Sequence, residues 1–431
     1  MGMDERDDIG REVLHGMYHR AGLTPVDFET FHRAELPRRL AEGASDAVHW
    51  DVAGARPFAI VLPGERVFSF IAGADRVEVL PGIAQDAETI VEMSEEAWID
   101  FRYEMRTWIG LLYSNALRFR RGSFDTGDRW APALRTLYSG RPLYDWRNLD
   151  FRDLAGRPLD LHRRFGLDDS REEMSNFLVQ TGYLVVKRAF DPGLVAQLST
   201  ELDRVRDEAV PGELTSWWAD DGKGGRFPYR LTYLSEKSPE FAALYENPRV
   251  VELRDLAKAN AVPTPDRIEG ILAVLKEFQP GAEVSAFANL PFHNDCGLGG
   301  CHITCPCVLV GIQLDAANAG SSQLHMMAGS WGKSFHPFPD AAMRARLPII
   351  PLVTEPGDAT VHIGCGLHAG PGPTGSSRRR TIYIQHYSPR TPELIGWHAG
   401  YNQMMPGYGE GDIPNFEEVK EVVGEGPNPA R

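Results

Sequence analysis

The segment Gly357-Asp-Ala-Thr-Val-His-Ile-Gly-Cys-Gly-Leu-His368-Ala-Gly-Pro371 has the pattern of a short strand that runs into a glycine-rich turn and ends at a histidine. Similar apolar runs, each bounded by Gly, Pro, Asn or Asp, occupy residues 271–278, 308–314, 323–327 and 379–387. Several short strands separated by turn signals are typical of two packed antiparallel sheets. We therefore predict a mainly β fold with helices, a double-stranded β-helix (a cupin-like jelly roll).

Two amphipathic helices are predicted immediately before these strands. Ser170-Arg-Glu-Glu173 has the form of a capping box, and Gly182 ends the first helix ahead of the strand Tyr183-Leu-Val-Val186. Asp191-Pro192 begins the second helix. A helical lead-in followed by strands favours one domain, which we place at residues 165–431.

A smaller α+β domain is predicted upstream, at residues 1–150. Residues 57–62, 67–71 and 76–80 have the pattern of an antiparallel meander. A helix follows, with Ser94 as its N-cap. An apolar stripe at helical spacing continues along it through Trp98, Phe101, Met105, Trp108 and Ile109. We expect this stripe to pack on the sheet.

The order of these upstream elements resembles the sterol-carrier-protein type of lipid-binding domain. The resemblance covers about residues 10–145 and rests on the sheet, the stretch 88–98, the helix and Gly127-Asp128. It implies an apolar tunnel for a lipid or acyl ligand, lined by the aromatic stripe. The alternative is that the stripe is simply the core face of a helix.

Composition and charge restrict the partners and the compartment. Among 431 residues, 60 are acidic and 45 basic, giving a net charge of −15, which disfavours nucleic acid and anionic membrane surfaces. The start of the chain lacks the pattern of a secretory signal, and there is no apolar run of about 20 residues, so we expect no integral membrane contact. The five cysteines do not form a secreted disulfide pattern, and we predict a cytoplasmic protein.

Pro291-Phe-His293-Asn-Asp295 supplies a candidate metal site. A histidine and an aspartate at positions i and i+2 of an extended segment project from one face and can bind one ion together. His368 would add a second imidazole. Two histidines and one carboxylate are the facial ligand set of Fe(II) oxygenases, which leaves positions open for a co-substrate and O2.

A candidate carboxylate anchor follows the distal histidine. Ser376-Ser-Arg-Arg379-Arg-Thr381-Ile-Tyr-Ile384 leads three arginines into a strand. Period-two alternation places Arg379 and Thr381 on one face, with Tyr383 and Gln385, and places Arg380 and the apolar Ile pair on the other face, against helices. Arg379 would then point into the barrel and bind the far carboxylate of 2-oxoglutarate through its planar fork.

From about residue 169 to residue 389 the sequence resembles the phytanoyl-CoA dioxygenase family of Fe(II)- and 2-oxoglutarate-dependent oxygenases. The resemblance rests on the order of the opening helix, the strand 183–186, the Asp191-Pro192 helix, His293-x-Asp295, Leu324 to Ser330, Gly357-Asp358, His368 and the arginine eleven positions later. It implies the metal ligands His293, Asp295 and His368, and Arg379 as the 2-oxoglutarate anchor. We also predict that Thr381, on the same face of the strand, binds 2-oxoglutarate. Ser321-Ser-Gln-Leu324, Ala328 and Gly311 depart from the family pattern.

The resemblance implies an enzyme that couples the oxidation of 2-oxoglutarate by O2 to oxidation, most commonly hydroxylation, of an unactivated C–H bond. The expected substrate is a small, apolar or carrier-linked organic molecule. The alternatives are a non-catalytic lipid-binding or transfer protein with a structural barrel, and a metal hydrolase or isomerase that uses the same ligands without a carboxylate anchor.

Several further residues invite a functional interpretation. The cluster Cys296, Cys301, His302, Cys305 and Cys307 does not have the spacing of a zinc site, and we expect free thiols. Core or outer-sphere positions are predicted for four strand histidines, His325, His336, His362 and His386. Trp217-Trp218 lies in a polar, Gly-rich stretch that predicts a loop.

Overall fold

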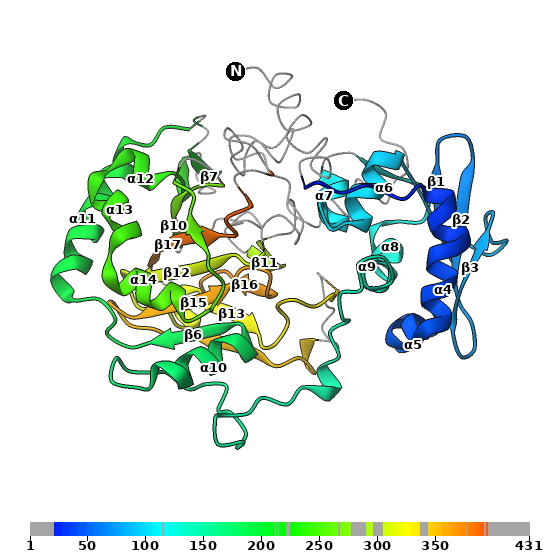
Figure 1. Cartoon of the computed structure of the whole chain (residues 1–431). Helices are drawn as coiled ribbons and strands as arrows, with labels where there is room; N and C mark the ends of the chain where they lie inside the picture. Colours follow the sequence, from blue (N-terminus) through cyan, green and yellow to red (C-terminus); the bar gives the residue numbers. More distant parts are fainter. Residues whose placement is uncertain are drawn as a thin grey trace.

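The computed structural model describes residues 21–113, 116–211, 213, 215–220, 225–265, 268–276, 290–295, 305–336, 344–375, 377–391 and 394. In Figure 1 these residues form two units, which we call the N-terminal unit (residues 21–139) and the C-terminal unit (residues 165–394). None of the helices in this described part has the length and apolarity that crossing a bilayer requires.

The N-terminal unit contains a mixed sheet in the order β3-β2-β1-β4-β5. Its strands are β1 (Phe58–Leu62), β2 (Arg66–Ala72), β3 (Val77–Pro81), β4 (Thr89–Met93) and β5 (Leu117–Arg121). The first three pair as the predicted antiparallel meander, while β4 runs parallel to β1. The helical segments before the sheet are α3 (Phe28–Thr30), η1 (Phe31–Glu35), α4 (Leu36–Arg39), η2 (Leu40–Ala44) and α5 (Ser45–Val52).

Four helices complete the N-terminal unit: α6 (Glu95–Arg102), α7 (Trp108–Tyr113), α8 (Phe124–Asp128) and α9 (Ala131–Ser139). Ser94 caps α6 as predicted, with its side chain accepting from the backbone N–H of Ala97. The prediction that one helix continues to Ile109 is wrong, because α6 ends at Arg102 and a turn precedes α7. Trp98, Phe101 and Trp108 remain in the core of the unit.

Met105 leaves that core because of the turn. It belongs to a different apolar cluster, together with residues of the C-terminal unit. Helical periodicity predicted that the Met105 side chain packs on the sheet with the rest of the stripe. The turn directs this side chain into the other cluster instead. The lipid tunnel that the carrier resemblance implies stays a prediction.

Two antiparallel sheets form the centre of the C-terminal unit. The larger has the order β6-β15-β12-β17-β10-β8-β7, with β9 paired to β17, and the smaller the order β11-β16-β13-β14. The larger sheet comprises β6 (Tyr183–Val186), β7 (Ser216–Asp220), β8 (Arg226–Leu231), β9 (Val262–Pro263), β10 (Ile271–Lys276), β12 (Val308–Gln313), β15 (Ala359–Ile363) and β17 (Arg379–Tyr387). The smaller comprises β11 (Leu290–His293), β13 (Leu324–Met327), β14 (Ile349–Leu352) and β16 (His368–Gly370).

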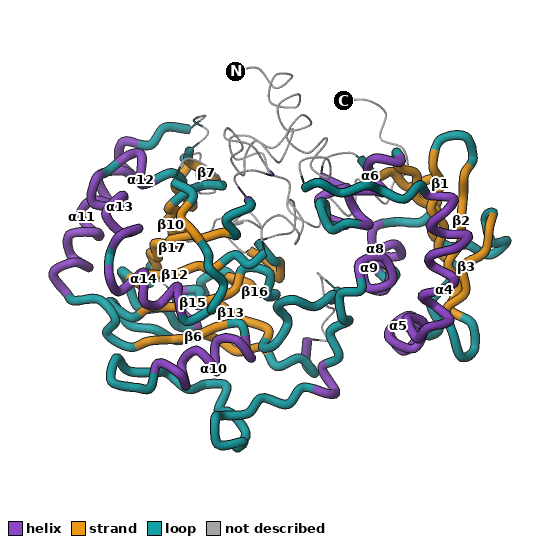
Figure 2. Tube along the Cα trace, in the orientation of Figure 1, coloured by secondary structure: helices purple, strands orange, loops and turns teal. Residues whose placement is uncertain are grey.

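Helices lie along the outside of these sheets, as Figure 2 shows. They are α10 (Arg171–Thr181), α11 (Pro192–Glu208), α12 (Leu234–Lys237), α13 (Pro239–Ala242) and α14 (Pro248–Asp255), with short 3₁₀ turns η3 (Trp146–Asn148), η4 (Ala243–Glu246) and η5 (Ala319–Ser321). The predicted caps of the first two are present: the Ser170 side chain accepts from the Glu173 N–H, and the Asp191 side chain accepts from the Leu194 N–H. Apolar residues of helices and sheets share one core.

The prediction of a loop at Trp217-Trp218 is wrong. Both residues lie in β7, which forms an antiparallel hairpin with β8 and extends the larger sheet. Both tryptophans are buried, at 5% and 9% exposed. Polar and glycine-rich neighbours obscured this strand, whose pairing partner follows immediately in the sequence.

The two units are in contact through Ser334 and His336. The hydroxyl of Ser334 donates to the carbonyl of Pro132 at 2.8 Å. His336 Nε2 lies 3.2 Å from Asp51 Oδ1, and its Nδ1 lies 3.8 Å from Asp128 Oδ2. A histidine of the C-terminal unit is therefore held between two carboxylates of the N-terminal unit.

This contact makes stability depend on pH. Burial alone would lower the pKa of His336, but Asp128 and Asp51 raise it from 6.5 to about 9. Because the folded pKa exceeds the unfolded one, the stabilisation is complete below about pH 6.5 and is lost as the pH rises through 9, a change on the order of 3 kcal/mol. Denaturant unfolding at pH 6 and 9.5 measures it, and His336→Gln should remove most of the difference. An unchanged pH dependence in that variant would contradict the assignment.

Candidate metal centre

His293 and Asp295 occupy one end of the smaller sheet. His293 is the last residue of β11, and Asp295 follows it in a turn. The backbone N–H of Asp295 donates to the carbonyl of Gly364 at 2.8 Å, which ties this turn to the segment after β15. The last residue of a strand and a residue of the turn that follows it therefore present an imidazole and a carboxylate together.

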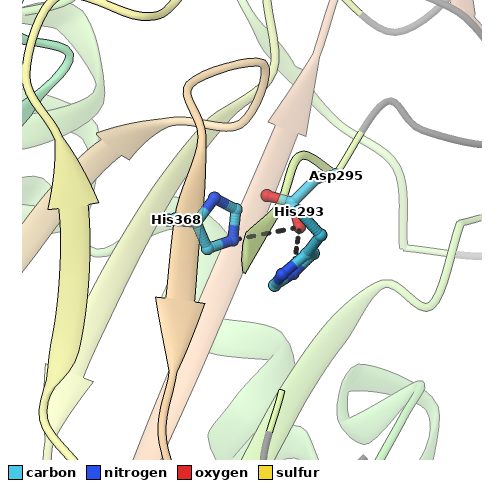
Figure 3. Close-up of side chains that lie close together, drawn as sticks. All are labelled: His293, Asp295 and His368. Carbon is cyan, nitrogen blue, oxygen red and sulfur yellow. Dashed lines mark ion pairs between the residues drawn. The ribbon is translucent and has the colours of Figure 1, made fainter. Parts of the chain in front are cut away.

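His368 reaches the same point from β16. It lies opposite His293 in the antiparallel register, and the centroids of the two imidazole rings are 4.3 Å apart. Its Nδ1 lies 2.9 Å from the carbonyl of Gly366, so the other ring nitrogen, Nε2, faces Asp295. Figure 3 shows the three side chains converging on one point. The structure thus brings together the three residues that the sequence analysis selected as metal ligands.

The distances between their ligand atoms fit one ion. Asp295 Oδ1 is 3.6 Å from His368 Nε2 and 3.9 Å from His293 Nε2, and one ligand atom from each residue lies within 4.8 Å of the others. Nitrogen, nitrogen and carboxylate oxygen are donors that suit non-haem Fe(II). These three residues therefore fit a single metal ion with open coordination positions.

The surroundings of Asp295 also favour a cation. Its second oxygen, Oδ2, is buried and has no hydrogen-bond partner in the described part of the chain. A Cβ atom at Gly364 would lie 2.9 Å from that oxygen, so only glycine leaves room for the carboxylate. Burial alone would raise the pKa of Asp295, but His368, His362 and His293 outweigh it and hold the pKa well below its usual value.

These three residues line a pocket of about 680 Å³, counting the part open to solvent. Arg379 lines it and is 3% exposed. The guanidinium donates to the carbonyl of Ser322 at 2.6 Å and to the hydroxyl of Tyr383 at 2.7 Å. Tyr383 and Gln385 line the same pocket, so the predicted alternation of β17 is present.

Thr381 lies next to Arg379, and its predicted contact with 2-oxoglutarate stays a prediction. Its hydroxyl accepts from Arg379 Nε at 3.0 Å and donates to the side-chain oxygen of Gln313 at 2.9 Å. Gln313 in turn donates to Thr360 at 3.2 Å. This row of polar side chains orients the guanidinium, and Thr381 itself is fully buried.

Two pocket residues were not selected from the sequence. Lys276 is 4% exposed and pairs in register with Arg379 across β10 and β17. Burial, and then Arg379 and Arg230, lower its pKa to about 7. Trp217 reaches the pocket from the hairpin. Alternation from Leu272 through Val274 would have placed Lys276 on the pocket face of β10. The stretch around Trp217 was interpreted as a loop, so the sequence did not place the indole in this pocket.

The other candidate residues take separate positions. His362 lines the pocket, with its Nε2 3.8 Å from Asp295 Oδ2, and burial lowers its pKa. His386 packs against Tyr245, and His325 is half-buried on β13. Cys307 is a buried free thiol, and Cys305 is partly buried. Cys296, Cys301 and His302 lie outside the described residues.

Comparison with protein families gives a match over residues 178–381, to the family model described as Phytanoyl-CoA dioxygenase (PhyH). The chain is therefore similar to this family over residues 178–381, just under half of its length. The PhyH family is Fe(II)- and 2-oxoglutarate-dependent, and the candidate metal residues and Arg379 all lie within the matched segment. The family match begins within α10, ends within β17 and leaves the N-terminal unit outside it.

Solved structures similar to the chain cover about half of it. AviO1 from Streptomyces viridochromogenes Tue57 is 22% identical over 51% of this chain and 96% of its own, with a TM-score of 0.40. The non-haem α-ketoglutarate-dependent epimerase SnoN from nogalamycin biosynthesis is 18% identical over 51% and 83%, with a TM-score of 0.37. EctD from S. alaskensis with bound Fe is 14% identical over 55% and 83%, with a TM-score of 0.41. A comparison with curated proteins finds no match.

Proposed function

We propose that this protein is an Fe(II)- and 2-oxoglutarate-dependent oxygenase that hydroxylates an unactivated C–H bond of a small organic substrate. The observation that carries the proposal is the convergence of His293, Asp295 and His368 at one end of a pocket that also contains the buried Arg379. A metal hydrolase with the same ligands would have no use for a buried guanidinium within the pocket.

Each of these side chains has a defined task in the proposal. His293, Asp295 and His368 would hold Fe(II) on one face and leave the remaining positions to the co-substrate and O2. Bound Fe(II), with 2-oxoglutarate and O2, supplies the oxidising power that converts R–H to R–OH while 2-oxoglutarate becomes succinate and CO2. Arg379 would bind the far carboxylate of 2-oxoglutarate, and Thr381 would keep the guanidinium oriented.

The remaining pocket wall supports an apolar substrate. Leu272, Val274, Leu309 and Leu324 line it, together with the indole of Trp217. Apolar walls exclude water and bind the hydrocarbon part of a ligand, while a few polar groups set its orientation. We therefore propose a substrate with an apolar body, free or linked to a carrier.

The architecture is part of the same proposal. The two antiparallel sheets of residues 183–387 support a double-stranded β-helix, and the separate apolar cores support an α+β domain at residues 1–150 and an oxygenase domain at residues 165–431. We propose a cytoplasmic location. A lipid or acyl ligand in the N-terminal domain stays a prediction.

The full-length protein tests this function directly. It is incubated with Fe(II), 2-oxoglutarate and O2, and with a panel of apolar acids and their thioesters, while succinate is measured. We expect a substrate that raises succinate release above the background, with one succinate formed for each hydroxylated product. Lipid binding without 2-oxoglutarate consumption would favour a carrier protein, and turnover independent of 2-oxoglutarate would favour a hydrolase or isomerase.

A further inference from the structure

The turn between α6 and α7 carries a side chain out of the N-terminal unit. Met105, in this turn, is fully buried and packs in a cluster with Leu272, Leu309 and Tyr383 of the C-terminal unit. The same three residues line the pocket beside the candidate metal centre. Met105 is not among the lining residues, so it supports the pocket wall from behind.

This turn is held in place by ion pairs to Asp100, Arg135 and Arg141. Arg106 donates to Asp100 Oδ2 at 2.8 Å, and the two side chains are 4% and 0% exposed. Glu104 has a left-handed backbone (φ 58°), and it accepts from Arg135 Nε at 2.7 Å and from Arg141 Nη2 at 2.6 Å. Non-glycine residues in this conformation cost about 1–3 kcal/mol and persist only where the surroundings enforce them.

The supported wall connects to the proposed co-substrate anchor. Tyr383 belongs to the cluster of Met105, and its hydroxyl accepts from Arg379 Nη2 at 2.7 Å. A side chain that contacts a ligand directly is held in one position only when the packing of its neighbours locks the rotamers. The apolar cluster to which Tyr383 belongs includes Met105, and Ala21, Leu23 and Tyr103 of the N-terminal unit also pack against this cluster.

We propose that Met105 is a positioning residue for 2-oxoglutarate: through it the N-terminal unit holds Tyr383, and with it the guanidinium of Arg379. This inference rests on the proposed function. It makes the N-terminal unit a part of the active site, in addition to any ligand of its own. Met105 itself touches neither 2-oxoglutarate nor the metal.

Calorimetric titration of 2-oxoglutarate into the full-length, Fe(II)-loaded protein without O2 tests the proposal. Met105→Ala should weaken binding about fivefold, the equivalent of one loosened hydrogen bond. Met93→Ala is the matched control, since Met93 is a buried methionine in the core of the same unit. The Met93→Ala variant should lose stability and keep its affinity for 2-oxoglutarate. Met105→Leu, which nearly conserves the volume, should retain most of the affinity.

A double-mutant cycle shows whether Met105 acts through Tyr383. In a Tyr383→Phe background, Met105→Ala should have little further effect. If the alanine variant does not fold, Met105→Val gives the same comparison with less volume lost. Equal affinities of the Met105→Ala and Met93→Ala variants would overturn this inference alone. Absence of 2-oxoglutarate binding by the unchanged protein would overturn the proposed function, and this inference with it.

Discussion

Replacement of His293, Asp295 or His368 by alanine is expected to abolish tight Fe(II) binding and substrate-coupled turnover of 2-oxoglutarate. Each residue supplies one of three ligand atoms that lie within 4.8 Å of one another. The loss should exceed the roughly 10- to 100-fold that follows removal of a hydrogen-bond partner of a metal ligand. Bound iron after desalting and succinate release measure the two effects.

The control for these variants is His325→Ala. His325 is a half-buried histidine of β13, and it pairs with Ala369, the neighbour of His368. It therefore tests for loss of a strand imidazole close to the site but outside the ligand set. Normal iron content in the three ligand variants, or equal losses in the control, would show that the metal centre is misassigned.

Arg379→Ala should weaken 2-oxoglutarate binding by roughly 25- to 4,000-fold. This range corresponds to about 2–5 kcal/mol, the cost of truncating one partner of a buried charged pair. The guanidinium is 3% exposed and is already oriented by Thr381, Ser322 and Tyr383. Arg379→Lys should recover only part of the loss, because an ammonium group has no planar fork. Titration of 2-oxoglutarate without O2 separates binding from chemistry.

The neighbouring Arg380 provides a control from the opposite face of the same strand. It is buried and donates to Asp315 at 2.9 Å and to Asp203 at 3.1 Å, the latter on α11. Arg380→Ala should therefore lower the free energy of unfolding by about 1.5–3 kcal/mol and leave 2-oxoglutarate affinity unchanged. A large affinity loss at Arg380 with none at Arg379 would mean that the other face of β17 binds the co-substrate.

The candidate site could be predicted to the extent that it depends on local periodicity. Alternation along β17 placed Arg379, Thr381 and Tyr383 on one face, because a strand has a side-chain period of two wherever it pairs. The i and i+2 spacing also indicated that His293 and Asp295 present their side chains together, although Asp295 lies in the turn after β11. The direct pairing of His293 with His368 could not be derived, since the register of strands 75 residues apart depends on the whole sheet.

Long-range contacts account for the two wrong predictions, the continuous helix through Ile109 and the loop at Trp217-Trp218. The stripe from Trp98 to Trp108 keeps helical spacing, yet the helix stops because Glu104 meets Arg135 and Arg141 of a distant segment. Met105 is buried in either arrangement, so its apolar character does not say which core it enters. The strand at Trp217 likewise depends on pairing with β8, which outweighs the polar, glycine-rich neighbours.

The order of strands in the larger sheet also has a consequence for how the chain folds during synthesis. Its edge strand β6 pairs with β15, which lies more than 170 residues later, whereas β1 and β2 each pair with the strand that follows them directly. Local pairs form early, and distant ones wait for the chain to emerge, here for roughly ten seconds or more at ribosomal speed. The N-terminal unit can therefore present a finished surface, with the Met105 turn in place, as a template on which the later strands assemble.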